Sequence, residues 1–197
     1  MKALTQQINF IMEIDKLKAV YRQTTVKEDN NRQENSAEHS WHIALAAIIL
    51  QEYAGKTIDI SRVIQMLLIH DVIEIDAGDL FAFEDQKNQE EQEIKEKKAA
   101  ERLFSLLPQN QAKEFKDLWF EFEDCISADA CFAKAIDRIL PLFINMRNEG
   151  GSWVKHRISK SQVLKRNLYL KEASPKLWDY VQEEVQEAVK NSWLEDK

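Results

Sequence analysis

The sequence predicts an all-α fold, a single domain of about seven or eight helices over residues 1–197. Only 4 Gly and 3 Pro are present, so few residues are available for the turns of a many-stranded sheet. Apolar residues instead recur at steps of three and four along most of the chain, which is the spacing of an amphipathic helix. The hydrophobic content of 44% is sufficient for a globular core, and no linker or internal repeat divides the chain.

The first helix is predicted to end near Val20, and one of its faces is an apolar stripe of Ile8, Ile11, Ile14 and Leu17. The polar segment RQTTVKEDNNRQ that follows is predicted to be a loop. The second helix should begin at the capping-box pair Asn35 and Glu38 and stop at Gly55. Because its middle is apolar on almost every side, this helix is expected at the centre of the fold.

The third helix, RVIQMLLIHDVIEI, can be capped by Asp59 or Ser61, should close at Gly78 and is also expected to be buried. The fourth helix, over residues 87–107, carries charges around a narrow apolar stripe. Such a pattern is typical of a helix that covers the core from outside. The stripe consists of Ile94, Ala99, Leu103 and Leu106.

Caps and prolines mark the remaining helices. Pro108 should end the fourth helix, QAKEFKDLWFEFE gives a fifth, and Ser127 can cap a sixth. Pro141 lies inside the sixth helix and is expected to bend or break it. A turn, NEGGSW, precedes a helical pattern over residues 159–173, and the last helix, residues 174–193, opens with a Ser-Pro pair.

Charge and cysteine content exclude several classes of protein. The formal net charge of −7 argues against a partner that is a nucleic-acid polymer or an anionic membrane, because such binding needs a broad basic surface. Neither a signal peptide nor a membrane-spanning helix is expected, since polar residues interrupt every apolar run. Cys125 and Cys131 form no CxxC pair, so they are predicted to be small core or near-core residues of a protein in the reducing cytoplasm.

One stretch, LLIHDVIEIDAGD, places several polar groups in an apolar helix. On a helix Glu74 lies one turn beyond both His70 and Asp71, so all three can border one pocket. Burying an ionised carboxylate without a partner costs several kcal/mol, which favours a bound cation. The alternative is that His70 bonds a backbone carbonyl while Asp71 and Glu74 face water at the end of the helix.

Two other helices carry polar residues in similar apolar surroundings. His39 and His42 are three residues apart near the start of the second helix, and one or both could turn inward. Asp137 lies in AKAIDRILPLF, where the alternative is a salt bridge with Lys134 or Arg138. Together the helices offer a set of two nitrogens and two oxygens, His39, His70, Asp71 and Asp137. Such a set suits one divalent ion such as Mn, Co, Fe, Zn or Mg and discriminates poorly among them.

The order His, then His-Asp, then Asp in a helical chain resembles the HD-domain superfamily of metal-dependent phosphohydrolases. The segments ENSAEHSW, HDVIEIDAGD, AERLFSLLP and KAIDRILPLFIN, in this order, resemble the subgroup that includes bacterial 5'-deoxynucleotidases. The similarity covers about residues 8–170, and the C-terminal helix is expected to pack on this core. The resemblance implies that the four metal ligands are His39, His70, Asp71 and Asp137.

The resemblance also implies roles for three further residues. Glu74 falls on the position that the deoxynucleotidases use for acid/base chemistry, and Asp79 falls on a second carboxylate of their active site. Arg22 resembles the arginine near the end of the first helix that contacts the substrate. The next residue, Gln23, departs from the aromatic residue of a deoxynucleotidase, and this departure bears on nucleotide specificity more than on the reaction.

The predicted function is therefore hydrolysis of a small phosphorylated substrate, a deoxynucleoside 5'-monophosphate, by a metal-dependent phosphomonoesterase. A homodimer is implied by the resemblance alone. The alternatives are a hydrolase of a nucleoside triphosphate or a non-nucleotide compound, and a helical module that keeps the metal for stability. Oxygen activation at a di-iron pair is disfavoured, because only His42 and His156 remain unassigned.

Overall fold

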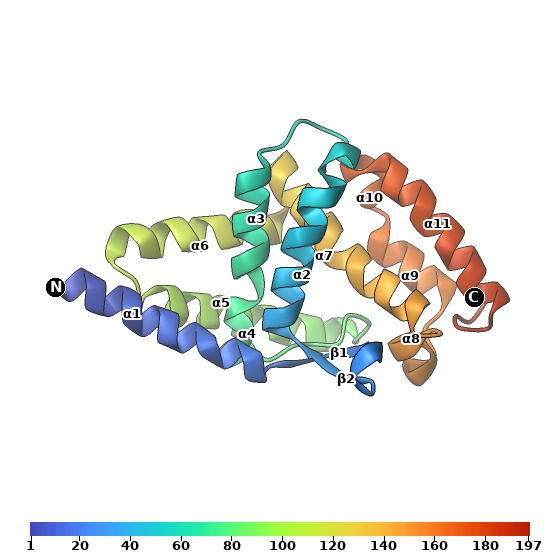
Figure 1. The fold of residues 1–197 in the computed structure, drawn as a ribbon, viewed down its shortest axis with the longest axis horizontal. Helices are drawn as coiled ribbons and strands as arrows, with labels where there is room; N and C mark the ends of the chain where they lie inside the picture. Colours follow the sequence, from blue (N-terminus) through green and yellow to red (C-terminus); the bar gives the residue numbers. More distant parts are fainter.

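A computed structural model describes all residues from 1 to 197 and is almost entirely helical (Figure 1). The helices are α1 (Lys2–Ile14), α2 (Ser36–Leu50), α3 (Ile60–Ile69), α4 (Glu74–Ala77), α5 (Gln86–Phe104), α6 (Gln109–Asp124), α7 (Ala128–Arg147), α8 (Gly151–His156), α9 (Lys160–Asn167), α10 (Leu170–Ala173) and α11 (Pro175–Lys190). The two strands are β1 (Tyr21–Val26) and β2 (Arg32–Asn35). The predicted all-α class is confirmed, and the helices outnumber the seven or eight expected because short turns split several of them. None of them is long and apolar enough to cross a membrane.

The centre of the fold is formed by α2, α3 and α7, which pack against one another. Ile43, Met66 and Ile136 lie on these three helices and are fully buried. In Figure 1, α1, α5 and α6 extend to one side of this centre, and α8 to α11 cover the other side. The N and C termini therefore lie towards opposite ends of the molecule's long axis.

The predicted helix starts agree with the structure in detail. The Asn35 side chain accepts a hydrogen bond from the Glu38 amide, and the Glu38 carboxylate accepts one from the Asn35 amide, which completes the capping box of α2. Asp59, rather than Ser61, caps α3 and accepts hydrogen bonds from two backbone amides. Ser127 caps α7 through the amide of Ala130.

The segment after α3 leaves the regular helix where the polar residues begin. Residues His70–Ile73 form a 3₁₀ turn, and the single helical turn α4 follows directly. Gly78 then ends the helix with φ of 75°, a conformation that favours glycine over other residues. The predicted third helix therefore does close at Gly78, but as three successive pieces that turn the polar side chains toward α7.

Several predictions for individual residues are wrong. The segment predicted as a loop before residue 34 is an antiparallel hairpin of β1 and β2, with Thr25 opposite Gln33. Ile94, placed in the apolar stripe of the covering helix, is largely exposed, and so are Ile8 and Ile11 on the apolar face predicted for the first helix. Of the bend or break expected at Pro141, the break is absent, because α7 is continuous from Ala128 to Arg147. The predicted turn NEGGSW contains the start of α8 at Gly151.

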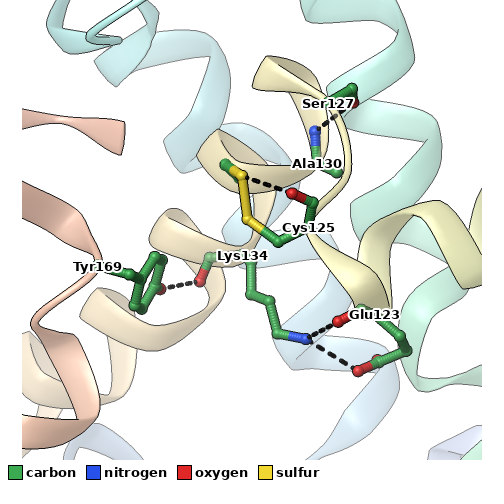
Figure 2. Close-up of a disulfide and its surroundings, with 7 residues drawn as sticks. Glu123, Cys125, Ser127, Ala130, Lys134 and Tyr169 are labelled. Carbon is green, nitrogen blue, oxygen red and sulfur yellow. Dashed lines mark hydrogen bonds and ion pairs between the residues drawn. A yellow bond between two sulfur atoms is a disulfide. The ribbon is translucent and has the colours of Figure 1, made fainter. Parts of the chain in front are cut away.

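The two cysteines are paired, contrary to the prediction of unpaired core residues in a reducing compartment. Cys125 and Cys131 form a disulfide with an S–S distance of 2.05 Å that joins the end of α6 to the first turns of α7 (Figure 2). Cys125 has a φ of 50°, and this left-handed turn brings the chain back so that the two Cα atoms lie 4.8 Å apart. Sequence spacing alone carries no signal for this turn. Nearby, Lys134 donates to the Glu123 carboxylate at 2.9 Å, which ties the same two helices together (Figure 2).

Candidate metal and phosphate site

Three of the predicted ligand residues converge from separate parts of the chain. His39 on α2, His70 in the 3₁₀ turn and Asp137 on α7 have potential ligand atoms within 4.8 Å of one another. His39 Nε2 lies 2.9 Å from Asp137 Oδ1, and His70 Nε2 lies 3.5 Å from the same oxygen. The packing of α2, α3 and α7 thus positions this cluster.

Asp71 lies at the border of the cluster rather than inside the group of three. Its Oδ1 is 2.9 Å from His70 Nε2, whereas its Oδ2 accepts a hydrogen bond of 2.8 Å from Arg22 Nη1. One carboxylate therefore connects the histidines with the arginine that the sequence singled out. Small rotations of this side chain decide which neighbour it serves.

The alternatives left open by the sequence are now decided. His70 Nδ1 donates to the Leu67 carbonyl at 2.9 Å, as the alternative for this residue proposed, yet Asp71 and Glu74 are only 7% and 8% exposed. His39 is fully buried, whereas His42 is half-buried against Trp41 on the outer side of α2.

Asp137 bonds His39 instead of forming a salt bridge with Lys134 or Arg138. Lys134 is engaged by Glu123. The carboxylate of Asp137 therefore belongs to the buried cluster and not to the surface of α7.

The electrostatics of the cluster favour positive charge. Burial raises the pKa of the Asp137 carboxyl, but hydrogen bonds from His39 and His70 outweigh it and hold that pKa well below its usual value. Burial also opposes a charge on His70, yet the neighbouring carboxylates of Asp71 and Asp137 raise its pKa well above the usual value. His70 Nε2 is buried and makes no well-aligned hydrogen bond, although carboxylate oxygens of Asp71 and Asp137 lie 2.9 and 3.5 Å from it. A mixed nitrogen and oxygen donor set with such an imidazole nitrogen fits a divalent ion.

Arg22 on β1 faces three carboxylates. Its Nη1 lies 2.8 Å from Asp71 Oδ2, 3.8 Å from Asp79 Oδ1 and 3.9 Å from Glu74 Oε1. Burial opposes the charge of this guanidinium, but the carboxylates outweigh burial and raise its pKa. The residues that the resemblance assigned to substrate binding and acid/base chemistry are thus neighbours in space.

Glu74 and Asp79 hold their protons more firmly than ordinary carboxyl groups. Ser36 Oγ donates to Glu74 Oε2 at 2.6 Å, and burial together with the charge of Asp71 raises the pKa of Glu74 well above its usual value. Burial is also the main cause that raises the pKa of Asp79 to about 6, and it outweighs the opposing charge of Arg22. Both groups are therefore suited to exchanging protons near neutral pH.

These groups open into one cavity of about 180 Å³. Its lining includes charged residues, among them Arg22, Asp71, Glu74, Asp79 and Asp137. It also includes apolar and amide residues, among them Leu142, Asn145, Trp153, Val163 and Asn167. A ligand that combines an anionic group with a less polar part matches this mixed lining.

Sequence reasoning missed Arg166, which lines the same cavity from α9. Its Nη1 donates to the Ala82 carbonyl at 3.1 Å, and no carboxylate lies within 4 Å of it. Burial, reinforced by the charge of Arg138, lowers the pKa of Arg166 to about 10, so it stays protonated at neutral pH. No local sequence pattern identifies Arg166 as a site residue, because KSQVLKRN has the pattern of an ordinary polar helix.

Gln23 lines the cavity, and His156 packs against two of the lining residues from outside. His156 Nε2 lies 3.3 Å from Gln23 Oε1, and its ring centre is 4.3 Å from that of Phe81. His156 is exposed, in agreement with its interpretation as a residue of the surface or the substrate rim. The position where the sequence departs from the deoxynucleotidases is therefore part of the cavity lining.

The chain belongs to the HD-domain family, because the family model of the HD domain matches residues 14–178. The curated 5'-deoxynucleotidase HDDC2 of Xenopus laevis is 32% identical over 131 residues, which are 66% of this chain and 63% of that protein. HDDC2 of Homo sapiens is 30% identical over 66% of this chain and 62% of that protein. The chain thus spans slightly less than two thirds of the length of these curated relatives.

A solved structure gives a closer match over the whole length. The crystal structure of a predicted metal-dependent phosphohydrolase from Magnetospirillum magnetotacticum MS-1 is 46% identical to this chain, with a TM-score of 0.93. The match covers 98% of this chain and 96% of that one. The resemblance to the HD-domain superfamily that the sequence motifs indicated is confirmed.

Proposed function

We propose that this protein is a metal-dependent phosphomonoesterase that hydrolyses deoxynucleoside 5'-monophosphates to deoxynucleoside and phosphate. The observation that carries the proposal is a cluster of buried His39 and His70 with part-buried Asp137, whose carboxylate lines the same cavity as Arg22, Glu74 and Asp79. The similarity to proteins named 5'-deoxynucleotidase and metal-dependent phosphohydrolase supports the same reaction.

In this proposal one divalent ion, of Mn, Co, Zn, Fe or Mg, is held by His39, His70, Asp71 and Asp137. Asp71 would turn its carboxylate from Arg22 toward the ion. A divalent ion in this place supplies Lewis-acid activation of a water molecule and offsets negative charge on the phosphoryl group. The donor set, and the buried Nε2 of His70 that makes no well-aligned hydrogen bond, support this assignment.

Two arginines are proposed to bind the phosphate. Arg22 offers a guanidinium that can form paired hydrogen bonds to phosphate oxygens once Asp71 no longer occupies it. Arg166 adds a second cation that has no carboxylate partner and lines the same cavity. Together they supply local positive charge in a protein whose net charge is −7.

Glu74 is proposed as the acid/base residue and Asp79 as a second catalytic carboxylate. Glu74 is held by Ser36 and lies 3.9 Å from Arg22, so it is fixed next to the proposed phosphate position. It can orient and deprotonate the attacking water or protonate the leaving 5'-oxygen. Asp79 lies 3.8 Å from Arg22 and can restrain the guanidinium in the binding geometry.

The nucleoside would contact less polar residues of the cavity lining, such as Leu142 and Trp153. Gln23 also lines the cavity, and its amide can contact the sugar or the base. A nucleoside triphosphate or a non-nucleotide phosphate is the substrate in the alternative proposals, which product analysis distinguishes.

A homodimer is also proposed, and exposed apolar side chains on three helices support it. They are Leu4, Ile8, Ile11 and Met12 on α1, Trp41, Leu45, Ile48 and Ile49 on α2, and Leu68 on α3. The four on α2, with Leu68 on the packed helix α3, are the most concentrated group, and exposed apolar surface of this kind marks an interface. Light scattering should give a dimer for the wild type and a monomer for Ile49→Glu. Ile126→Glu, at an exposed apolar position beside the disulfide, is the control and should stay dimeric.

The cytoplasm is proposed as the compartment, because deoxynucleoside monophosphates are metabolites of the cell interior. The Cys125–Cys131 disulfide is a feature of oxidising compartments and opposes this proposal. Counting free thiols in protein isolated under thiol-blocking conditions decides between the cytoplasm and an oxidising compartment.

The experiment that tests the function is phosphate release by metal-stripped protein to which Mn, Co or Mg is restored. The substrates are ribo- and deoxynucleoside mono- and triphosphates. Metal-dependent release from deoxynucleoside monophosphates alone is the expected result. Release from none of them by metal-loaded protein would contradict the proposal and favour a non-nucleotide substrate or a binding role.

A further inference from the structure

Glu34 is a buried carboxylate to which neither the sequence motifs nor the proposed function gives a role. It lies on β2, just before the capping box of α2, and is only 5% exposed. One of its oxygens, Oε2, faces three donors. It accepts a hydrogen bond of 2.8 Å from Thr24 Oγ1 and lies 3.6 Å from His39 Nδ1 and 3.7 Å from Arg22 Nε.

Two of these three groups have no hydrogen-bond partner. Arg22 Nε and His39 Nδ1 are both buried without one, and Nδ1 of the neutral His39 ring is a donor when Nε2 carries no proton, as it must when Nε2 binds a cation. An unsatisfied buried donor costs about 1–3 kcal/mol, so a closing movement of a few tenths of an ångström would be favourable. Glu34 Oε2 is the carboxylate oxygen that both nitrogens face.

The chemistry of a metal-binding imidazole explains how the contact between Glu34 and His39 can act in the site. When Nε2 of His39 binds a cation, the ring proton must be on Nδ1, and a carboxylate that accepts it fixes both the tautomer and the ring plane. The same carboxylate can hold Arg22 through Nε and leave the two terminal nitrogens free for phosphate. Thr24, itself buried, holds Glu34 in place from the opposite strand.

We propose that Glu34 is a positioning residue that orients His39 for metal binding and Arg22 for phosphate binding, and so couples the two halves of the site. The inference rests on the proposed function, since it assigns a metal to His39 and a phosphate to Arg22. The hairpin is essential to it, because β1 carries Arg22 and Thr24 whereas β2 carries Glu34.

The test is Glu34→Gln, which keeps the size of the side chain and removes its charge. Two readouts are measured: the Kd for Co²⁺ by calorimetry and the absorption spectrum of the cobalt protein. Inorganic phosphate binding is then measured on the metal-loaded protein. Loss of a carboxylate partner of a ligating histidine typically weakens metal affinity 10–100-fold, and this is the expected change. A weaker affinity for phosphate and an altered cobalt spectrum should accompany it.

The matched control is Glu28→Gln, the same substitution on the exposed turn between the two strands, where the carboxylate has no ion-pair partner. It should leave metal and phosphate affinity unchanged. Glu34→Asp keeps a carboxylate and should restore part of the metal affinity. Thr24→Val removes the hydrogen bond to Glu34 without touching the charge and should weaken both affinities less than Glu34→Gln does.

The outcomes separate this inference from the proposed function. Wild-type affinities in folded Glu34→Gln would overturn the role of Glu34, whatever the substrate is. Weakened cobalt binding in a protein that hydrolyses no nucleotide would support Glu34 while contradicting the proposed function. If Glu34→Gln does not fold, as judged by circular dichroism, Thr24→Val and Glu34→Asp decide, and unchanged affinities in both would overturn the inference.

Discussion

Asp79 should destabilise the folded protein at neutral pH, and replacing it with asparagine should therefore increase stability. Burial raises its pKa from an ordinary value of 3.8 to about 6. Because the folded-state pKa is the higher one, the folded protein binds the proton more tightly, and stability falls as the pH rises through this range. At ~1.4 kcal/mol per pH unit, the penalty is about 3 kcal/mol at pH 8 and about 1.5 kcal/mol at pH 5.

Asp79→Asn removes the charge and keeps the shape, so it should raise the free energy of unfolding by up to about 3 kcal/mol at pH 8. For a domain of this size the melting temperature would rise by about 6–12 °C. Urea unfolding of EDTA-treated protein at pH 8 and pH 5 measures the effect without a contribution from bound metal. The control is Asp179→Asn, on the exposed side of α11 and without an ion-pair partner. It should leave the free energy of unfolding unchanged at both pH 8 and pH 5.

The same variant should lose activity, because the penalty is the cost of keeping a proposed catalytic carboxylate ionised in a buried site. Two results would refute the reasoning. One is an Asp79→Asn protein no more stable than wild type at pH 8. The other is an equal gain at pH 5 and pH 8, since an effect that does not depend on pH cannot come from this ionisation.

Three other predictions concern the site and the core. Asp71→Ala should abolish metal binding and activity, whereas Glu74→Ala should keep the metal and lose the rate; an active, metal-replete Asp71→Ala protein would contradict the site assignment. Arg166→Met should weaken competitive inhibition by inorganic phosphate by about 10–100-fold, because that is the free energy of a charge-assisted hydrogen bond expressed as a ratio of affinities. The affinity for metal should not change. Unchanged inhibition would exclude Arg166 from phosphate binding. Trp119 donates a hydrogen bond from Nε1 to the His70 carbonyl at 3.1 Å. Trp119→Phe should therefore lower the free energy of unfolding, measured by urea denaturation, by about 1–3 kcal/mol. An unchanged free energy of unfolding would show that this hydrogen bond is dispensable.

The sequence predicted the helical frame well because its signals are local. The capping box at Asn35 and the cap at Ser127 depend on side chains three residues from the amides that they bond. Apolar periodicity identified the buried middle of α2 and α3 for the same reason. It placed Ile8 and Ile11 on one face of α1 but did not predict that they are exposed, because an apolar stripe does not show what covers that face.

The candidate site was predictable only where family motifs carried it. The sequence alone could not choose between His39 and His42, and the burial of His39 decides this in the structure. Arg166 was missed because it lies in no motif, and Glu34 was missed because the segment ENSAEHSW, which it opens, gave it no role. Each reaches the site only when distant segments pack together, α9 against α7 for Arg166 and β2 beside β1 for Glu34. The hairpin itself escaped prediction since YRQTTV has no clear apolar alternation and buries a single residue, Thr24.

The residues of the site lie on two kinds of structural element. The proposed ligands His39 and Asp137 lie on long helices of the rigid centre, where packing holds them in place. Arg22 and Gln23 lie instead on the hairpin, and Asp79 follows the glycine that ends α4. Substitution of Gln23, which lines the cavity, can therefore change substrate contacts alone, whereas substitution of Thr24 or Glu34 also reaches the proposed metal ligand His39.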